Sequence, residues 1–189
     1  MVKLNKITTK TGDKGQSKFK KKRINKNDSV FDILGDLDEL NASIGFCVTL
    51  NKNEKKINTI LSKIQNKLFD IGAEFLSNSN FTKNRYKVGI DEINWIEKEN
   101  QIISDKLDFI DSFIIPGGDS KSAYLHVTRT ICRRVERNLV NFYSNNPSAR
   151  NENILAIFNR LSDLFFNLAR YYNKKNNKNE ILWIPNDEL

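Results

Sequence analysis

Apolar residues recur every three to four positions over most of the chain, a spacing that places them on one face of an α-helix. Two such patterns cover residues 34–50 and 53–77, and a weaker one covers residues 89–107. A fourth follows the PGGDS segment at 116–120, and a fifth covers residues 151–173. Almost no segment alternates apolar and polar residues as a strand does. The pattern therefore predicts an all-α fold, a five-helix bundle.

The beginning of the chain does not share this periodicity. Residues 8–28 contain the turn-forming sequence TGDKG and then a basic run. Glycine leaves main-chain N–H groups accessible and nearby lysines supply positive charge, so the segment is similar in kind to a phosphate-binding loop. We expect it to be either disordered or ordered by a ligand. We divide the single domain, residues 1–189, into an N-terminal loop (1–33), a helical bundle (34–175) and a C-terminal tail (176–189).

Composition limits the kinds of site. The 189 residues include 31 Lys and Arg against 23 Asp and Glu, a net charge of +8 that favours a polyanionic partner. Lys and Asn are also abundant at 51–56 and 172–180, which indicates a general bias at solvated positions. One histidine and two cysteines are too few for a Cys/His zinc site, an iron–sulfur cluster or a disulfide framework. Without a membrane-length apolar run or a secretory signal, we expect a soluble, cytoplasmic protein.

The fourth predicted helix carries arginines on one face. At about 100° per residue, four polar side chains fall together: Arg129, Arg133, Glu136 and Arg137. They lie opposite an apolar stripe of Val127, Ile131 and Val135. A solvated face with an Arg/Glu pair is one interpretation. Arginine in a lysine-rich chain favours the other, bidentate binding of phosphate or carboxylate.

Two further predicted helices carry polar strips. On the fifth, the strip consists of Asn159, Asp163, Phe166 and Arg170. On the first, Asp38 lies on a strip with Ala42 and Gly45, whose small size would let a backbone or a flat ligand approach closely. Asp38 is either a solvated acid favoured by the helix dipole or a residue that holds an arginine in place. The glycine loop, the basic run that ends at Lys26 and the arginine face of the fourth predicted helix together indicate a triphosphate ligand.

Together these motifs resemble the PduO-type ATP:cob(I)alamin adenosyltransferases. The resemblance follows the chain through TKTGDKG (9–15), KND (26–28), GDLDELNASIG (35–45), FIIPGG (113–118), AYLHVTRTICRRVER (123–137) and NRLSDLFFNLARY (159–171). It implies a homotrimer of five-helix bundles with an irregular N-terminal ATP-binding segment, and ATP and corrinoid bound between neighbouring subunits. The implied reaction transfers the 5′-deoxyadenosyl group of ATP to the cobalt of cob(I)alamin, giving adenosylcobalamin and triphosphate, with Mg²⁺ as cofactor.

The resemblance also implies site residues. The N-terminal ATP-binding residues are Thr9, Lys10, Thr11, Gly12, Ser17, Lys18 and Lys26. The ATP contacts on the fourth and fifth helices are Arg133, Glu136, Arg137 and Asn159. Among the residues with catalytic roles, Arg133 stabilises the leaving triphosphate, and Asp38 pairs with Arg129 across the subunit interface. Phe113 binds the corrinoid and displaces its lower ligand, leaving a four-coordinate cobalt that is easier to reduce to Co(I). The resemblance implies no metal-ligating residue.

One segment departs from the family pattern. SKFKKKRIN (17–25) lacks the usual glycine and is one residue shorter, which leaves the register of Ser17 and Lys18 open. Two other functions fit parts of the sequence: a basic helical nucleic-acid-binding protein, and a non-catalytic carrier or sensor of corrinoid or nucleotide. The resemblance favours the enzyme, with no nucleic-acid or membrane partner. It would act in cobalamin biosynthesis beside a flavoprotein reductase and an adenosylcobalamin-dependent enzyme.

Overall fold

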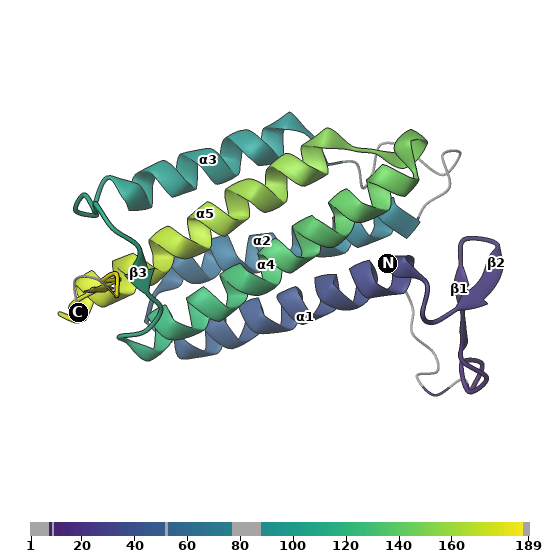
Figure 1. Cartoon of the computed structure of the whole chain (residues 1–189), viewed down its shortest axis with the longest axis horizontal. Helices are drawn as coiled ribbons and strands as arrows, with labels where there is room; N and C mark the ends of the chain where they lie inside the picture. Colours follow the sequence, from purple (N-terminus) through teal and green to yellow (C-terminus); the bar gives the residue numbers. More distant parts are fainter. Residues whose placement is uncertain (1–7, 9, 52, 77–87, 187–189) are drawn as a thin grey trace.

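The computed structural model describes residues 8, 10–51, 53–76 and 88–186. In this part of the chain five α-helices lie side by side in an elongated bundle (Figure 1): α1 (Ser29–Leu50), α2 (Lys55–Leu76), α3 (Ile90–Ser104), α4 (Ser120–Asn145) and α5 (Glu152–Lys175). A short 3₁₀ helix (Pro147–Ala149) joins α4 to α5. α4 packs most closely on α5, while α1 packs on α4 and α3 on α5. The prediction of an all-α five-helix bundle is confirmed.

Each helix contributes an apolar stripe to one continuous core. Leu40, Leu61 and Phe158 are fully buried there. The stripe predicted for α4 is partly wrong, because Val127 is 47% exposed. Since α4 lies between α1 and α5, its buried face passes instead through Leu125, Thr128 and Cys132.

Local capping sets where two of the helices begin. α1 begins at Ser29, five residues before the periodic pattern, because the Asp28 carboxylate accepts a hydrogen bond from the Val30 N–H at 3.0 Å. The bundle therefore starts inside the segment predicted as the N-terminal loop. Asp119 caps α4 in the same way, accepting from the Lys121 N–H at 2.9 Å.

Residues 16–25 form a β-hairpin, so the prediction that 8–28 lacks regular structure is wrong here. β1 (Gln16–Phe19) pairs antiparallel with β2 (Lys22–Asn25). In the turn, Lys20 takes the left-handed conformation that glycine usually supplies, with φ 54°. The Phe19 ring lies 6.4 Å from the Phe75 ring of α2, which anchors the hairpin at one end of the bundle. Figure 1 shows it beyond the first turn of α1.

A second two-stranded sheet lies at the opposite end of the bundle (Figure 1). β3 (Ile114–Ile115), in the α3–α4 connection, pairs antiparallel with β4 (Ile181–Leu182) in the C-terminal tail. The tail is thereby fastened to the segment that contains Phe113. Among the described residues, no helix is both long and apolar enough to span a membrane.

Candidate active site

The outer faces of α4 and α5 form a polar strip that contains the predicted helical ATP contacts. Arg133 and Arg137 are exposed on it, whereas Arg129 and Glu136 are half-buried. The Asn159 side-chain amide of α5 donates to the Glu136 carboxylate of α4 at 3.5 Å. Within the described part of the chain, Arg133 and Arg137 have no hydrogen bond or ion pair. Glu136 and Asn159 are therefore joined across the two helices, and the guanidinium groups of Arg133 and Arg137 are accessible on the same strip.

Arg160 fixes the orientation of Asn159, a role that the sequence analysis missed. Its Nη1 donates to the side-chain oxygen Oδ1 of Asn159 at 2.7 Å, and its Nε donates to Glu97 of α3, also at 2.7 Å. The amide nitrogen of Asn159 therefore points toward Glu136. Burial raises the pKa of the nearby Asp163 carboxyl, against the opposing charges of Arg160 and then Arg133. Because Arg160 directly follows Asn159 in the sequence, this contact could have been predicted.

Arg129 and the single histidine lie beside Phe166 at one end of the strip. The Arg129 guanidinium lies 6.0 Å from the Phe166 ring centroid, and its Nε is buried without a hydrogen-bond partner among the described residues. Burial, together with the charge of Arg133, lowers the pKa of Arg129. His126 packs edge-on against Phe166, with ring centroids 5.9 Å apart. Burial and the charge of Arg129 lower the pKa of His126 to about 4, so the imidazole is neutral at pH 7.

No hydrogen bond or ion pair joins Asp38 to Arg129 of the same chain. The acidic residues of α1 that reach α4 are Asp36 and Glu39, which both bind Arg134, with Asp36 Oδ1 3.0 Å from Arg134 Nε. These contacts turn one face of α1 toward α4. Asp38 lies off that face and is exposed, where a second molecule can reach it.

The N-terminal loop is closed by its own backbone. The Gly15 N–H donates to the Gly12 carbonyl at 3.1 Å, and the Lys26 N–H donates to the Gly15 carbonyl at 2.8 Å. A Cβ on Gly12 would lie only 3.0 Å from Lys26 Nζ, so a side chain there would push the ammonium away. Lys10, which begins the turn, has φ 57°. The structure thus brings the loop glycines and the predicted Lys26 together.

The remaining predicted N-terminal residues are less closely grouped. Ser17 and Lys18 follow each other in β1 and so face opposite sides of the hairpin, with Ser17 half-buried and Lys18 exposed. The Thr11 carbonyl accepts a hydrogen bond from Arg23 Nη2. Thr9 lies outside the described residues. No hydrogen bond or ion pair among the described residues joins this loop to the polar strip of α4 and α5.

Phe113 directly precedes β3, the strand that lies at the far end of the bundle from the hairpin (Figure 1), and is 78% exposed. Its carbonyl accepts a hydrogen bond from the Trp183 N–H at 2.7 Å, and the two rings pack edge to face with centroids 6.3 Å apart. The buried Asn173 side chain holds the following turn by accepting from the Asp119 N–H at 2.8 Å and donating to the Gly117 carbonyl at 3.2 Å. The sequence analysis missed Trp183 and Asn173, although a tryptophan in a polar tail was a usable indication.

Two interpretations of polar residues need correction. Arg170 was placed on the polar strip of α5 with Asn159 and Asp163, but its side chain is only 8% exposed and pairs with Glu180. The Lys- and Asn-rich stretches are not uniformly solvated either, since Asn51 and Asn173 are 0% and 2% exposed. Composition alone cannot separate such residues from the surface. The Asn173 amide is hydrogen-bonded to Asp119 and Gly117, whereas the Asn51 side chain has no hydrogen-bond partner among the described residues.

The model of the family described as cobalamin adenosyltransferase matches residues 7–172. The chain belongs to the cobalamin adenosyltransferase family. It is 36% identical over 181 residues to a cobalamin adenosyltransferase of Cupriavidus metallidurans, covering 95% of each chain. It is 34% identical over 192 residues to the human corrinoid adenosyltransferase MMAB, covering 96% of this chain and 74% of the human one.

Solved structures of the family have the same fold. A variant PduO-type ATP:corrinoid adenosyltransferase from Lactobacillus reuteri, complexed with cobalamin and ATP, matches with a TM-score of 0.86 and 33% identity. The match covers 95% of this chain and 100% of that one. This member of the cobalamin adenosyltransferase family is an ATP:cob(I)alamin adenosyltransferase. Of the three functions that the sequence left open, the enzyme is confirmed.

Proposed function

We propose that each active site is completed by two subunits: the N-terminal loop of one and the polar strip on α4 and α5 of its neighbour bind ATP together. The observation that carries this proposal is the strip itself, where Arg133 and Arg137 are exposed without a partner among the described residues. Guanidinium groups suit the polyanionic triphosphate, and Lys10 and Lys26 add ammonium groups from the loop. The remaining predicted loop residues would contribute backbone N–H and hydroxyl donors.

The proposed chemistry is a displacement at the 5′ carbon of ATP. The Co(I) centre of the substrate supplies the electron pair for the new Co–C bond, and the bond from C5′ to the triphosphate oxygen breaks with its pair leaving on that oxygen. Arg133 would donate to the leaving triphosphate and stabilise the negative charge that grows there. Glu136 and Asn159, joined across α4 and α5, would present a carboxylate and an amide to the nucleotide.

Phe113 would meet the corrinoid. Its ring is exposed, while Trp183 packs beside it, so the side chain can insert beneath a flat ligand without leaving its own support. In that position it would displace the lower ligand of cobalt, which favours the four-coordinate state that is reduced to Co(I). The hard chemistry belongs to the corrinoid, and the protein orients it.

A homotrimer would bring the two halves of the site together. Phe46 and Val127 are each 47% exposed on α1 and α4, and Phe46 stacks on Tyr124 with ring centroids 4.3 Å apart. These apolar side chains are suited to burial against a second copy. Asp38, exposed on α1, would pair there with the Arg129 whose Nε lacks a partner in its own chain's described residues.

Mg²⁺ would accompany ATP rather than occupy a resident site. Among the described residues, no three His, Cys, Asp or Glu side chains gather as a metal-binding group. Magnesium commonly binds substrate phosphates and keeps several waters, which fits a site rich in phosphate-binding cations. The ion would neutralise part of the triphosphate charge, and Arg133 and Lys26 would hold the remainder.

The proposed setting is cobalamin biosynthesis in the cytoplasm, with a flavoprotein reductase supplying the electron for Co(II) and an adenosylcobalamin-dependent enzyme using the product. Both cysteines, Cys47 and Cys132, are free and buried, which suits a reducing compartment.

Subunit complementation tests the shared site. Lys26→Ala damages the loop and Arg133→Ala damages the strip, so each variant alone should be nearly inactive. When the two are co-expressed, a random closed trimer should recover about one quarter of wild-type activity, because only a loop from the second variant facing a strip from the first is intact. A site contained within one subunit would show no recovery.

A matched control separates the effect of the Arg133 charge at the site from the effect of lowering the total positive charge of the protein. Arg150→Ala removes an exposed arginine near the start of α5, where its partner is Glu152. It should leave kcat and ATP affinity unchanged. Arg133→Ala should lower kcat far more than it weakens ATP binding. Equal losses in the two variants would contradict the role assigned to Arg133.

A further inference from the structure

The sheet that supports Phe113 is too small to hold itself. β3 and β4 contain two residues each, and both residues of β4 are exposed. Beyond the ladder, the Trp183 N–H donates to the Phe113 carbonyl, and Ser112 Oγ donates to the Trp183 carbonyl at 3.1 Å. An isolated two-stranded sheet is marginal in water. Another contact must therefore fasten the tail to the α3–α4 connection.

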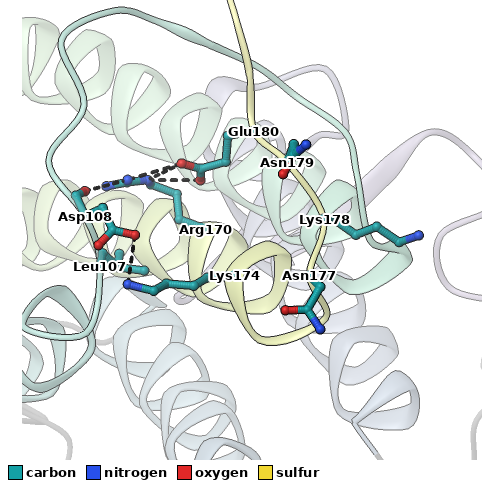
Figure 2. A pocket seen from close by; sticks show the side chains of 8 residues that line it. All are labelled: Leu107, Asp108, Arg170, Lys174, Asn177, Lys178, Asn179 and Glu180. Atoms are coloured by element: carbon teal, nitrogen blue, oxygen red, sulfur yellow. Dashed lines mark hydrogen bonds and ion pairs between the residues drawn. The ribbon is translucent and has the colours of Figure 1, made fainter.

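Arg170 provides that contact. Its side chain, 8% exposed, extends from α5 to the carboxylate of Glu180, with Nε 3.0 Å from Oε1 and Nη2 3.2 Å from Oε2. The same Nη2 donates to the backbone carbonyl of Asp108 at 2.7 Å. Lys174, one turn further along α5, binds the Asp108 carboxylate at 2.8 Å. Figure 2 shows Arg170 between Glu180 and Asp108, with the Lys174 side chain reaching Asp108.

Arg170, Glu180, Asp108 and Lys174 line part of a cavity of about 330 Å³. The charges of these four residues already neutralise each other in two ion pairs, Arg170 with Glu180 and Lys174 with Asp108, so they are not available to a ligand. In Figure 2 Lys178 points away from them. Asp108 precedes Phe113 by five residues and Glu180 precedes Trp183 by three, so Arg170 joins the two segments that meet at the aromatic pair.

We propose that Arg170 and Glu180 form a clasp that positions Phe113 for the corrinoid. They are positioning residues: neither touches the substrate, and both act by keeping the tail against the α3–α4 connection. The inference rests on the proposed contact between Phe113 and the corrinoid. Residues 180–183 thereby contribute to the reaction indirectly, because they determine where the Phe113 ring is held.

Glu180→Gln tests the clasp because it retains the size of the side chain and removes the charge that neutralises the buried guanidinium. Loss of one member of a buried ion pair is strongly destabilising locally. Hydrogen exchange of the ligand-free protein should speed up at least about tenfold at the backbone amides of residues 181–184. With Co(II) cobalamin and ATP both saturating, the fraction of four-coordinate Co(II) measured by electron paramagnetic resonance should fall at least twofold, while the Kd for ATP stays unchanged.

Two further variants complete the test. Glu152→Gln removes an ion pair between exposed groups at the other end of α5 and should match wild type in every readout. Glu180→Asp keeps the charge on a shorter side chain. Its exchange rates and its four-coordinate fraction should lie between those of wild type and Glu180→Gln. If Glu180→Gln does not fold, Glu180→Asp compared with wild type still tests the clasp. Unchanged exchange in Glu180→Gln, or faster exchange with a wild-type four-coordinate fraction, would overturn the clasp. If wild-type protein shows no four-coordinate Co(II), the proposed Phe113 contact fails instead, while hydrogen exchange still reports on the clasp.

Discussion

Removing the side chain of Asn173 should loosen the turn that connects β3 to α4. Asn173 is 2% exposed, and its amide binds the Asp119 N–H at 2.8 Å and the Gly117 carbonyl at 3.2 Å. A hydrogen bond of this kind contributes about 1 kcal/mol to stability. Asn173→Ala should therefore lower the free energy of unfolding by about 2 kcal/mol.

Gly118→Ala should act through the same contact. Gly118 has φ +90°, and a Cβ there would lie 2.3 Å from Asn173 Oδ1. The backbone conformation alone costs an L-residue about 1 kcal/mol, and the displaced Asn173 would lose both hydrogen bonds, for a total of about 3 kcal/mol. In the double variant the clashing amide is absent, so the loss should stay near 3 kcal/mol instead of reaching about 5, a coupling of about 2 kcal/mol.

Equilibrium urea unfolding of the four proteins, followed by far-ultraviolet circular dichroism, measures this coupling. Asn167→Ala is the matched control, because it removes a hydrogen bond of 2.9 Å to Asn100 elsewhere on α5. Its effect should add to that of Gly118→Ala. Additive losses for the Asn173 and Gly118 variants would refute the argument that the glycine is required by the close approach of the amide.

Two more predictions concern buried titratable groups. Because the folded pKa of His126, about 4, lies below its ordinary 6.5, stability should fall as the pH drops below about 6.5. At pH 5 the loss should reach about 2 kcal/mol relative to pH 7.5, and His126→Phe should abolish it in urea unfolding; an equal loss in both proteins would exclude His126 as the source. Cys132 is 0% exposed and burial raises its thiol pKa, while Cys47 is 2% exposed. Neither should react with a thiol reagent until urea unfolds the chain, when both should; labelling of the folded protein would contradict the observed burial.

The helices were predictable because each must bury one stripe, and that need fixes the spacing of its apolar residues. Leu40 and Leu61 lie where periodicity places them. The start of α1 was not predictable from periodicity, since it depends on the Asp28 cap. Val127 fits the α4 stripe by spacing but is exposed, because the direction of that stripe depends on two neighbouring helices.

The small sheets were harder to predict from the sequence. In the hairpin Lys20 takes a conformation that normally identifies glycine, so the usual turn signal is absent. The tail sheet depends on Arg170 and Glu180, which are ten residues apart and meet only after α5 ends. The segment that precedes β4, residues 172–180, is rich in Lys and Asn, a composition typical of a solvated chain end.

In the structure the predicted site residues lie in two separate groups. The strip on α4 follows from helical spacing, which places Arg133 near Arg137 whatever the packing. Backbone hydrogen bonds join Gly12 to Gly15 and Gly15 to Lys26. The TGDKG motif predicted a turn there, but not which residues these bonds would join. In the proposed trimer the loop meets the strip through contacts between subunits, which no periodicity within a single chain encodes.

Product formation tests the central claim most directly. Purified protein should be mixed with ATP, Mg²⁺ and chemically reduced cob(I)alamin, and the absorption spectrum followed in the dark. We expect conversion to the spectrum of adenosylcobalamin with release of one triphosphate per corrinoid, and a much lower rate for Arg133→Ala at saturating ATP. Binding of ATP and corrinoid without any adenosylated product would contradict the account and leave a carrier or sensor.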